Sequence, residues 1–234
     1  LVVDDDLFNK YDATKTILFT LATTSIWLGL LNSIQEICKE RVILAKEYMA
    51  DLKLSAYICS KSFVQCLLAF IQAFFLVILF VLLVGDIPSD GIVTYWYLET
   101  LFICFITIVS ASSLGLVVSS LSKNTSVAMT FAPLLLVPQL LFSGMLFPLE
   151  GIQEKISNFI LCRWSVEGLG TSVNLNSLPN NIESLVPNYS RAIEDYYTFT
   201  VEHFSFDIMM IFSMMVVLLI VCYFILKVQL EKNW

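Results

Sequence analysis

Long runs of apolar residues alternate along the chain with shorter polar stretches. Five runs are long enough for a helix to cross a lipid bilayer, which takes roughly 20 mostly apolar residues. They are residues 16–34, 63–84, 98–121, 127–147 and 208–227. We therefore expect an all-α, polytopic membrane protein in which residues 1–234 form a single transmembrane domain.

Composition agrees with this pattern. The 234 residues are 58% hydrophobic and 14% charged, whereas soluble domains average about 45–50% apolar and about 25% charged. The excess of apolar residues is too large for one soluble core, so part of it must face lipid. The net charge of −7 excludes a nucleic-acid partner. The N-terminus is acidic and does not read as a cleavable signal peptide.

Basic residues suggest an orientation, because Lys and Arg collect in short cytoplasmic loops. Residues 36–61 carry a concentration of charge between the first two runs. Placing them and the C-terminus in the cytoplasm puts most Lys and Arg in short inner loops, with residues 85–97 and 148–205 outside. We predict this orientation in a plasma membrane. The N-terminus then starts outside, which predicts a further helix upstream.

The search for catalytic chemistry is mostly negative. No Gly-x-x-x-x-Gly-Lys or His-Glu-x-x-His motif occurs, and one histidine cannot build a metal site alone. We predict no catalytic residue, metal ligand or cofactor in this segment. His203 is expected at the surface, with a proton sensor as the alternative. Cys162 is expected as a free buried thiol, with a bridge to a second copy as the alternative, and Asn188 begins an outer glycosylation sequon.

Residues 36–61 form an amphipathic pattern without Gly or Pro. Apolar and large residues recur every three or four positions, as in a helix: Ile37, Arg41, Leu44, Tyr48, Met49, Leu52 and Ala56. We expect a helix along the inner membrane surface that re-enters the bilayer at 57–63. It either anchors the loop at the interface or forms a docking surface for a cytoplasmic partner.

Three motifs carry a resemblance to a known family. They are Glu36-x-x-x-Glu40-Arg41 with the following Lys46-Glu47-Tyr48 and Ser55-Ala56-Tyr57-x-x-Ser60-Lys61, then Leu141-Phe142-Ser143-Gly144-Met145-Leu146-Phe147-Pro148, then Arg163-Trp164-Ser165-x-Glu167-Gly168-Leu169. In order and spacing they resemble the permeases of type-2 ATP-binding-cassette exporters, especially the G subfamily (the white/pigment-transporter group). The resemblance covers nearly the whole chain.

The resemblance implies an architecture and partners. The five runs would be the second to sixth helices of a six-helix permease, which pairs with a second permease copy as a homo- or heterodimer. A nucleotide-binding ATPase domain, on the same chain or a separate subunit, would bind ATP and Mg. The loop 36–61 would hold a coupling helix that contacts this ATPase through Glu40, Arg41, Glu47 and Tyr48.

The run 127–147 has its own chemistry. Pro133 and Pro138 kink a helix, and Gln139 must face protein or a wet cavity rather than lipid. The helix is either bent for packing or, as the resemblance implies, lines a central cavity. The resemblance places four residues against substrate and two in an apolar valve above it: Val137, Leu140, Ser25 and Leu28, then Met145 and Leu146.

Other polar and small residues suggest packing. Ala111, Gly115 and Ser119 form a line that permits close helix approach, and Gln65 and Gln72 are expected to join helices. An apolar stripe through residues 152–164 predicts a re-entrant or surface-lying helix in the outer segment.

Three functions fit the sequence. The leading prediction is the permease part of an ATP-driven exporter that moves lipids or other hydrophobic small molecules by alternating access. A passive channel or scaffold would need no docking surface, which the loop 36–61 supplies. A membrane-embedded enzyme would need a cluster of acids, bases or nucleophiles, which the five runs lack.

Overall fold

A computed structural model describes residues 8–84, 88, 90–145, 149, 151–179 and 194–232. Within these ranges the regular elements are helices, apart from one isolated bridge between Asp90 and Tyr95. The helices are α1 (Tyr11–Ser33), α2 (Glu36–Met49), α3 (Leu54–Val84), α4 (Trp96–Leu121), α5 (Thr125–Leu141), α6 (Ile152–Ser157), α7 (Leu161–Ser172) and α8 (Val201–Lys232), with short 3-10 turns η1 (Leu175–Ser177) and η2 (Asp195–Tyr197).

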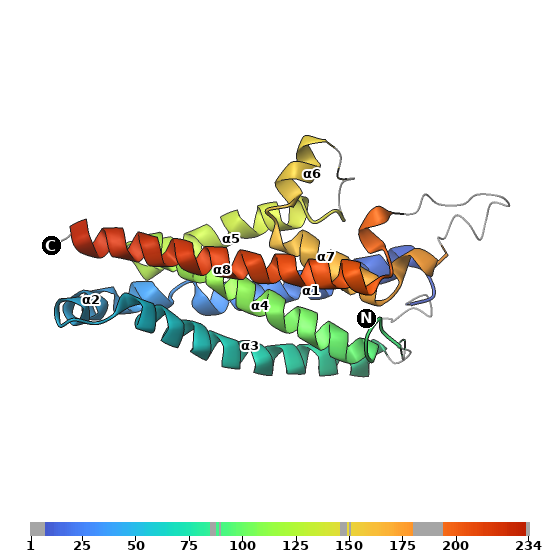
Figure 1. Ribbon diagram of the computed structural model, residues 1–234, viewed down its shortest axis with the longest axis horizontal. Coiled ribbons are helices and arrows are strands. Elements are labelled where there is room, and N and C mark those ends of the chain that lie inside the picture. The colour runs from blue at the N-terminus through green and yellow to red at the C-terminus, as the bar shows by residue number, and fades with distance from the viewer. Residues whose placement is uncertain are drawn as a thin grey trace.

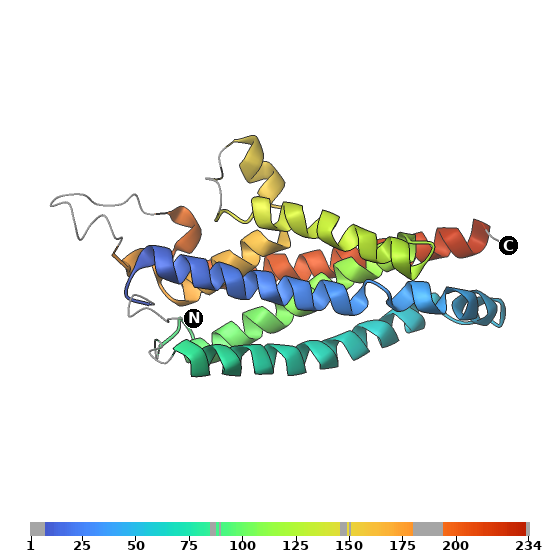
Figure 2. The ribbon, with the colours of Figure 1, turned by 180° about the vertical axis from the view of Figure 1, so that it is seen from behind.

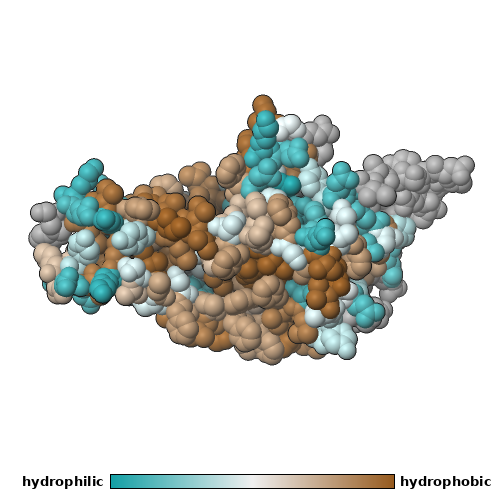
Figure 3. Space-filling model, viewed as in Figure 1, coloured by the Kyte–Doolittle hydropathy of each residue, from teal (hydrophilic) through white to brown (hydrophobic). Residues whose placement is uncertain are grey.

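The long helices form an elongated bundle with an apolar middle. Among the described residues, four helical segments are long and apolar enough to cross a membrane: Tyr11–Met49, α3, α4 and α8. In Figure 3 apolar side chains cover the middle of the molecule, and hydrophilic ones gather at its two ends. These features confirm an all-helical chain consistent with a polytopic membrane protein. The expected fifth span corresponds to α5, which has only 17 residues.

The helix α4 is the centre of the bundle, with α1, α3, α7 and α8 packed around it (Figure 1). Small residues let α1 approach closely. A Cβ added to Gly115 would lie 2.1 Å from Ser33 Oγ and 2.8 Å from the Leu30 carbonyl oxygen. A Cβ on Gly29 would lie 2.2 Å from the Ile108 carbonyl oxygen. Ala111 and Gly115 of the predicted small-residue line therefore pack against α1, whereas Ser119 Oγ accepts hydrogen bonds from the backbone N–H groups of Ile37 and Cys38 on α2.

Polar side chains join neighbouring helices, as the sequence predicts for Gln72, whereas the Oε1 atom of the buried Gln65 has no hydrogen-bond partner among the described residues. Asn32 Nδ2 on α1 donates to Gln72 Oε1 on α3 at 2.7 Å. Gln139 on α5 is buried, and its Oε1 accepts from the backbone N–H of Cys162 at 3.0 Å, in the first turn of α7. The bond satisfies a helix N-terminal donor that has no partner inside its own helix.

Two predicted boundaries are wrong. The expected uninterrupted helix through 36–61 ends at Met49, because Asp51 adopts a left-handed φ of 73° and α3 then begins at Leu54. The span expected to reach residue 147 ends at Leu141, because Gly144 turns the chain with a φ of 82°. Both are residue types that tolerate the left-handed region.

The apolar stripe through residues 152–164, which predicts one helix, falls on two helices of the described chain, α6 and α7. α6 is exposed, as are its first residue, Ile152, and Phe159, which follows it. α7, in contrast, is buried along its whole length and contacts α1, α4, α5 and α8. A buried helix between the long helices fits the re-entrant alternative better than a surface-lying helix.

Candidate functional site

The end of the bundle that holds α2 also holds the C-terminal end of α8 (Figure 1). Ile37 and Leu44 on α2 are buried in a small apolar cluster. The rest of this cluster comes from three other helices: Leu54, Ile58, Leu116, Cys222, Leu226 and Leu230. At 1.5 Å per residue, the 31 residues of α3 and the 32 of α8 span about 46 and 48 Å, longer than a hydrocarbon core of about 30 Å. Both helices are therefore long enough to carry α2 beyond the apolar middle.

Arg41 acts as a brace within the chain, because its side chain joins α2 to the end of α4 and to α8. Its guanidinium donates to the backbone carbonyl oxygens of Ser120 at 2.7 Å and Ser122 at 3.0 Å, where α4 ends. It also donates to Gln229 Oε1 on α8. The side chain therefore satisfies carbonyl groups that a helix C-terminus leaves without partners. The structure directs this predicted coupling residue inward.

The side chain of Glu40 also makes its polar contacts within the chain. Its carboxylate pairs with Lys61 Nζ on α3 at 2.7 Å and accepts a hydrogen bond from the Tyr57 hydroxyl at 3.2 Å. Glu36 lies 3.3 Å from the same Lys61 nitrogen. These pairs fix the angle between α2 and α3. Tyr48 is half-buried and packs against the apolar cluster.

The opposite side of α2 is exposed and mixed in character. We name it the α2 outer face, and it consists of Lys39, Val42, Ile43, Lys46, Glu47 and Met49. Val42 is 70% exposed, Ile43 57% and Met49 55%. Of the four predicted coupling residues, only Glu47 belongs to this face. An apolar strip with charged residues beside it is typical of a protein interface.

The predicted substrate-pathway residues do not all share one surface. α1 and α5 lie side by side (Figure 2). Val137 is half-exposed, and Leu28 and Leu140 are partly buried. Ser25 is fully buried, and its hydroxyl donates to the Leu21 carbonyl oxygen within α1 at 2.9 Å. In this chain Ser25 therefore presents no surface to a substrate.

The predicted valve is only partly within the described residues. Met145 is partly buried just beyond the Gly144 turn, and its backbone N–H donates to Ser143 Oγ at 3.3 Å. Leu146 lies outside the described residues, as does Asn188. Cys162 is completely buried, as expected.

A cavity of about 310 Å³ lies between α4, α5, α7 and α8. Its wall is mostly apolar, with Leu161, Met210 and Met214 among the lining residues, and Gln139 and Ser213 add polar groups. Gln139 is the one lining residue that the sequence predicts to face protein or a wet cavity, because the other lining residues come from distant parts of the chain.

A second polar group lies at the opposite end of the bundle, where α7 meets α8. Arg163 Nε lies 3.3 Å from Glu167 Oε2, and His203 Nε2 lies 3.2 Å from Glu167 Oε1. Asp207, one turn along α8 from His203, is completely buried. Burial raises the pKa of Glu167 to about 7, although the charges of Arg163 and His203 oppose this shift. His203 is thus a partner of buried acids, and the prediction of a plain surface histidine is wrong.

Comparisons with known proteins agree with these features. The family described as ABC-2 type transporter matches residues 4–172. The ABC transporter ATP-binding/permease protein Rv1747 of Mycobacterium tuberculosis is 25% identical over 205 residues, which are 86% of this chain and 23% of that protein. ABC transporter G family member 10 of Dictyostelium discoideum is 40% identical over 86 residues, 35% of this chain and 6% of that protein.

The chain thus spans less than a quarter of the length of either relative. The family match, in contrast, covers well over half of the chain and includes α1 to α5 together with the buried helix α7. The apolar helices agree with a multi-pass membrane protein. This chain therefore belongs to the ABC-2 type transporter family, of which it forms the membrane-spanning permease part.

Proposed function

We propose that this permease is the membrane half of an ATP-driven exporter of the G-subfamily type, moving lipids or other hydrophobic small molecules by alternating access. The α2 outer face docks a nucleotide-binding ATPase domain in the cytoplasm, where ATP and Mg are bound. The relatives' printed names support the ATPase, since one is an ATP-binding/permease protein and the other a G family member. Two permease copies complete the transporter.

The exposed apolar strip on α2 carries the proposal. Val42, Ile43 and Met49 are more than half exposed on a helix that lies at a hydrophilic end of the bundle. Exposing them to water is unfavourable unless a partner covers them. Lys46 and Glu47 beside them supply charges that select and orient such a partner. Glu40 and Arg41 take part indirectly, since they hold α2 at a fixed angle to α3, α4 and α8.

The cargo path belongs to the same proposal. Leu28 on α1, with Val137 and Leu140 on α5, forms the wall that faces the second permease copy and the hydrophobic cargo. Met145 and Leu146 form an apolar valve at the outer end of this wall, which closes by excluding water. Ser25 stabilises α1 from within rather than contacting cargo. A passive channel would leave the α2 outer face without a role.

Charge reversal on α2 tests the docking step. In the full-length transporter, Glu47→Lys lowers the stimulation of ATPase activity by hydrophobic substrates, because it reverses the charge that the α2 outer face presents to the ATPase domain. The matched control is Glu231→Lys, which reverses an exposed acid on α8 at the same end of the bundle. The measurement is ATPase rate in lipid nanodiscs over a panel of lipids and apolar compounds.

The two variants must behave differently. We expect Glu47→Lys to keep the wild-type melting temperature but lose most of the stimulation, with Glu231→Lys like wild type. Equal stimulation in wild type and Glu47→Lys would remove the docking role of α2. If no compound in the panel stimulates the ATPase activity of the wild type, the proposal of a hydrophobic cargo is contradicted.

A further inference from the structure

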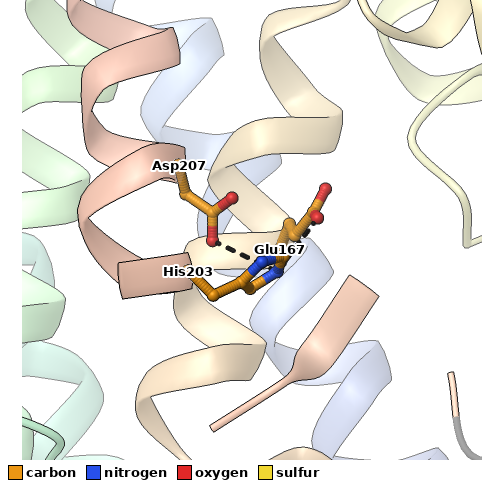
Figure 4. A group of neighbouring side chains, drawn as sticks. All are labelled: Glu167, His203 and Asp207. Atoms are coloured by element: carbon orange, nitrogen blue, oxygen red, sulfur yellow. Dashed lines mark ion pairs between the residues drawn. The ribbon is translucent and has the colours of Figure 1, made fainter. Parts of the chain in front are cut away.

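The polar group at the outer end of α7 and α8 has the composition of a metal site. Figure 4 shows Glu167 on α7 and His203 and Asp207 on α8 with their side chains directed toward one another. One ligand atom from each of the three lies within 4.8 Å of the other two. His203 and Asp207 are spaced by one helical turn, which places both on one face of α8.

The distances suit a small divalent ion. His203 Nε2 lies 3.2 Å from Glu167 Oε1 and 4.0 Å from Asp207 Oδ2. The Tyr196 carbonyl oxygen lies 2.9 Å from the same nitrogen. A tetrahedral ion with bonds of about 2.0–2.2 Å keeps its ligand atoms roughly 3.3–3.6 Å apart. Small side-chain rotations therefore bring these atoms into the geometry of zinc coordination.

Asp207 supplies an independent reason to expect a ligand. Its side chain is 0% exposed, yet neither carboxylate oxygen has a hydrogen-bond partner among the described residues. An isolated carboxylate away from water is strongly unfavourable. The single guanidinium nearby, Arg163, is engaged with Glu167 Oε2 and with Ser157 Oγ and Asn158. Arg163 therefore pairs with Glu167, and Asp207 is left without a hydrogen-bond partner among the described residues, a place that a bound cation would fill.

The donor types narrow the choice of ion. An imidazole nitrogen with carboxylate oxygens suits Zn²⁺ and its neighbours among the transition metals, whereas Mg²⁺ and Ca²⁺ take oxygen ligands. Arg163 at Glu167 Oε2 leaves Oε1 directed at His203, which is how an outer partner orients a ligating carboxylate. His203, with a side chain 24% exposed, gives an ion access from solvent.

We propose that Glu167, His203 and Asp207 bind a zinc-class divalent ion, with the Tyr196 carbonyl or a water as fourth ligand. The ion takes the place of the proton on His203 Nε2 and joins α7 to the outer end of α8. Because it binds only the folded arrangement, it stabilises the packing of the buried helix α7. The sequence alone gave no such site, since a single histidine needs the fold to bring two acids to it.

The test uses the full-length transporter, stripped of metal with EDTA and titrated with ZnCl₂ by calorimetry. Asp207→Asn and His203→Gln each remove one ligand with little change of shape, and we expect each to weaken zinc binding at least ~10-fold. Glu202→Gln is the matched control, an exposed acid on the same helix, and should bind as wild type does. Zinc bound elsewhere on the protein is common to all variants and is removed by difference.

Thermal unfolding in detergent gives a second readout. Zinc at 100 times its dissociation constant should raise the wild-type melting temperature by roughly 5 °C, with no rise in the two ligand variants. Should Asp207→Asn aggregate, His203→Gln decides alone, since its side chain is partly exposed. Absence of zinc binding in wild type, or equal affinity in wild type and His203→Gln, would overturn the proposal.

Discussion

The two ends of this permease use charge in opposite ways. At the α2 end, Glu36, Glu40 and Lys61 form ion pairs with partly exposed side chains, and Arg41 donates to carbonyl oxygens. At the α7–α8 end, the carboxylates of Glu167 and Asp207 are almost completely buried. Exposed pairs contribute little energy but hold register, whereas buried charges cost several kcal/mol unless they are compensated. The first end is built to present a surface, and the second to hold an ion.

The largest effect in this comparison is expected from Arg163. Replacing it by Met removes the guanidinium that pairs with Glu167 and leaves the two buried acids with His203 as their remaining basic neighbour among the described residues. We expect Arg163→Met to lower the free energy of unfolding by about 3–5 kcal/mol, measured by denaturant titration in detergent with EDTA present. Glu202→Gln is the control and should change little. A loss below about 1 kcal/mol would show that the acids do not depend on this guanidinium.

The second largest loss of stability is expected from a change at Arg41. The variant Arg41→Gln loses the bonds to the carbonyl oxygens of Ser120 and Ser122 and to Gln229, so the end of α4 is left with unsatisfied groups. We expect a loss of about 2–3 kcal/mol in the same unfolding experiment. Wild-type stability combined with lost ATPase stimulation would contradict the role of brace and return Arg41 to the docking interface.

The pair between α2 and α3 should be weaker. Lys61→Met removes the partner of Glu36 and Glu40, whose side chains are 31% and 41% exposed. We expect the free energy of unfolding to fall by at most about 1 kcal/mol, and this loss should shrink as the salt concentration is raised. Lys46→Met, at an exposed position on α2, is the control. A loss that is larger and independent of salt would mean that the pair is more deeply shielded than the structure shows.

The smallest effect on stability belongs to the α2 outer face. Ile43 is 57% exposed, so Ile43→Ser should change the free energy of unfolding by no more than about 0.5 kcal/mol. Coupling should nevertheless fall, because the apolar contact with the ATPase domain is lost. The measurement is substrate-stimulated ATPase activity in nanodiscs. Full stimulation with unchanged stability would indicate that this side of α2 faces no partner.

The hydropathy pattern predicts the long helices correctly, because the length and apolar composition of a span are properties of the local sequence. It places their ends less well. Asp51 and Gly144 turn the chain through left-handed conformations, and nothing in an apolar-run count records that. The spacing of three and four residues was more informative, since it put Arg41 and Tyr48 on the same stripe as Ile37 and Leu44. These four residues lie on the buried or partly buried side of α2, whereas Met49, from the same stripe, is exposed.

The candidate sites depend on contacts that sequence spacing does not reveal. Glu167 and His203 lie on different helices, and only the packing of α7 against α8 brings them to 3.2 Å. The i, i+4 spacing of His203 and Asp207 was the one local signal available. Gln139 shows the reverse case, in which a polar residue in an apolar run correctly predicts a protein partner without identifying it as Cys162 N–H.

The central claim, that the α2 outer face lies on the ATP side of the membrane, can be measured by thiol labelling in intact cells. In a background in which the native cysteines are replaced, a membrane-impermeant maleimide is applied to Glu47→Cys on α2 and to Glu154→Cys on the exposed helix α6. The account predicts that Glu154→Cys reacts in intact cells and Glu47→Cys only after permeabilisation. Labelling of Glu47→Cys from outside intact cells would contradict it.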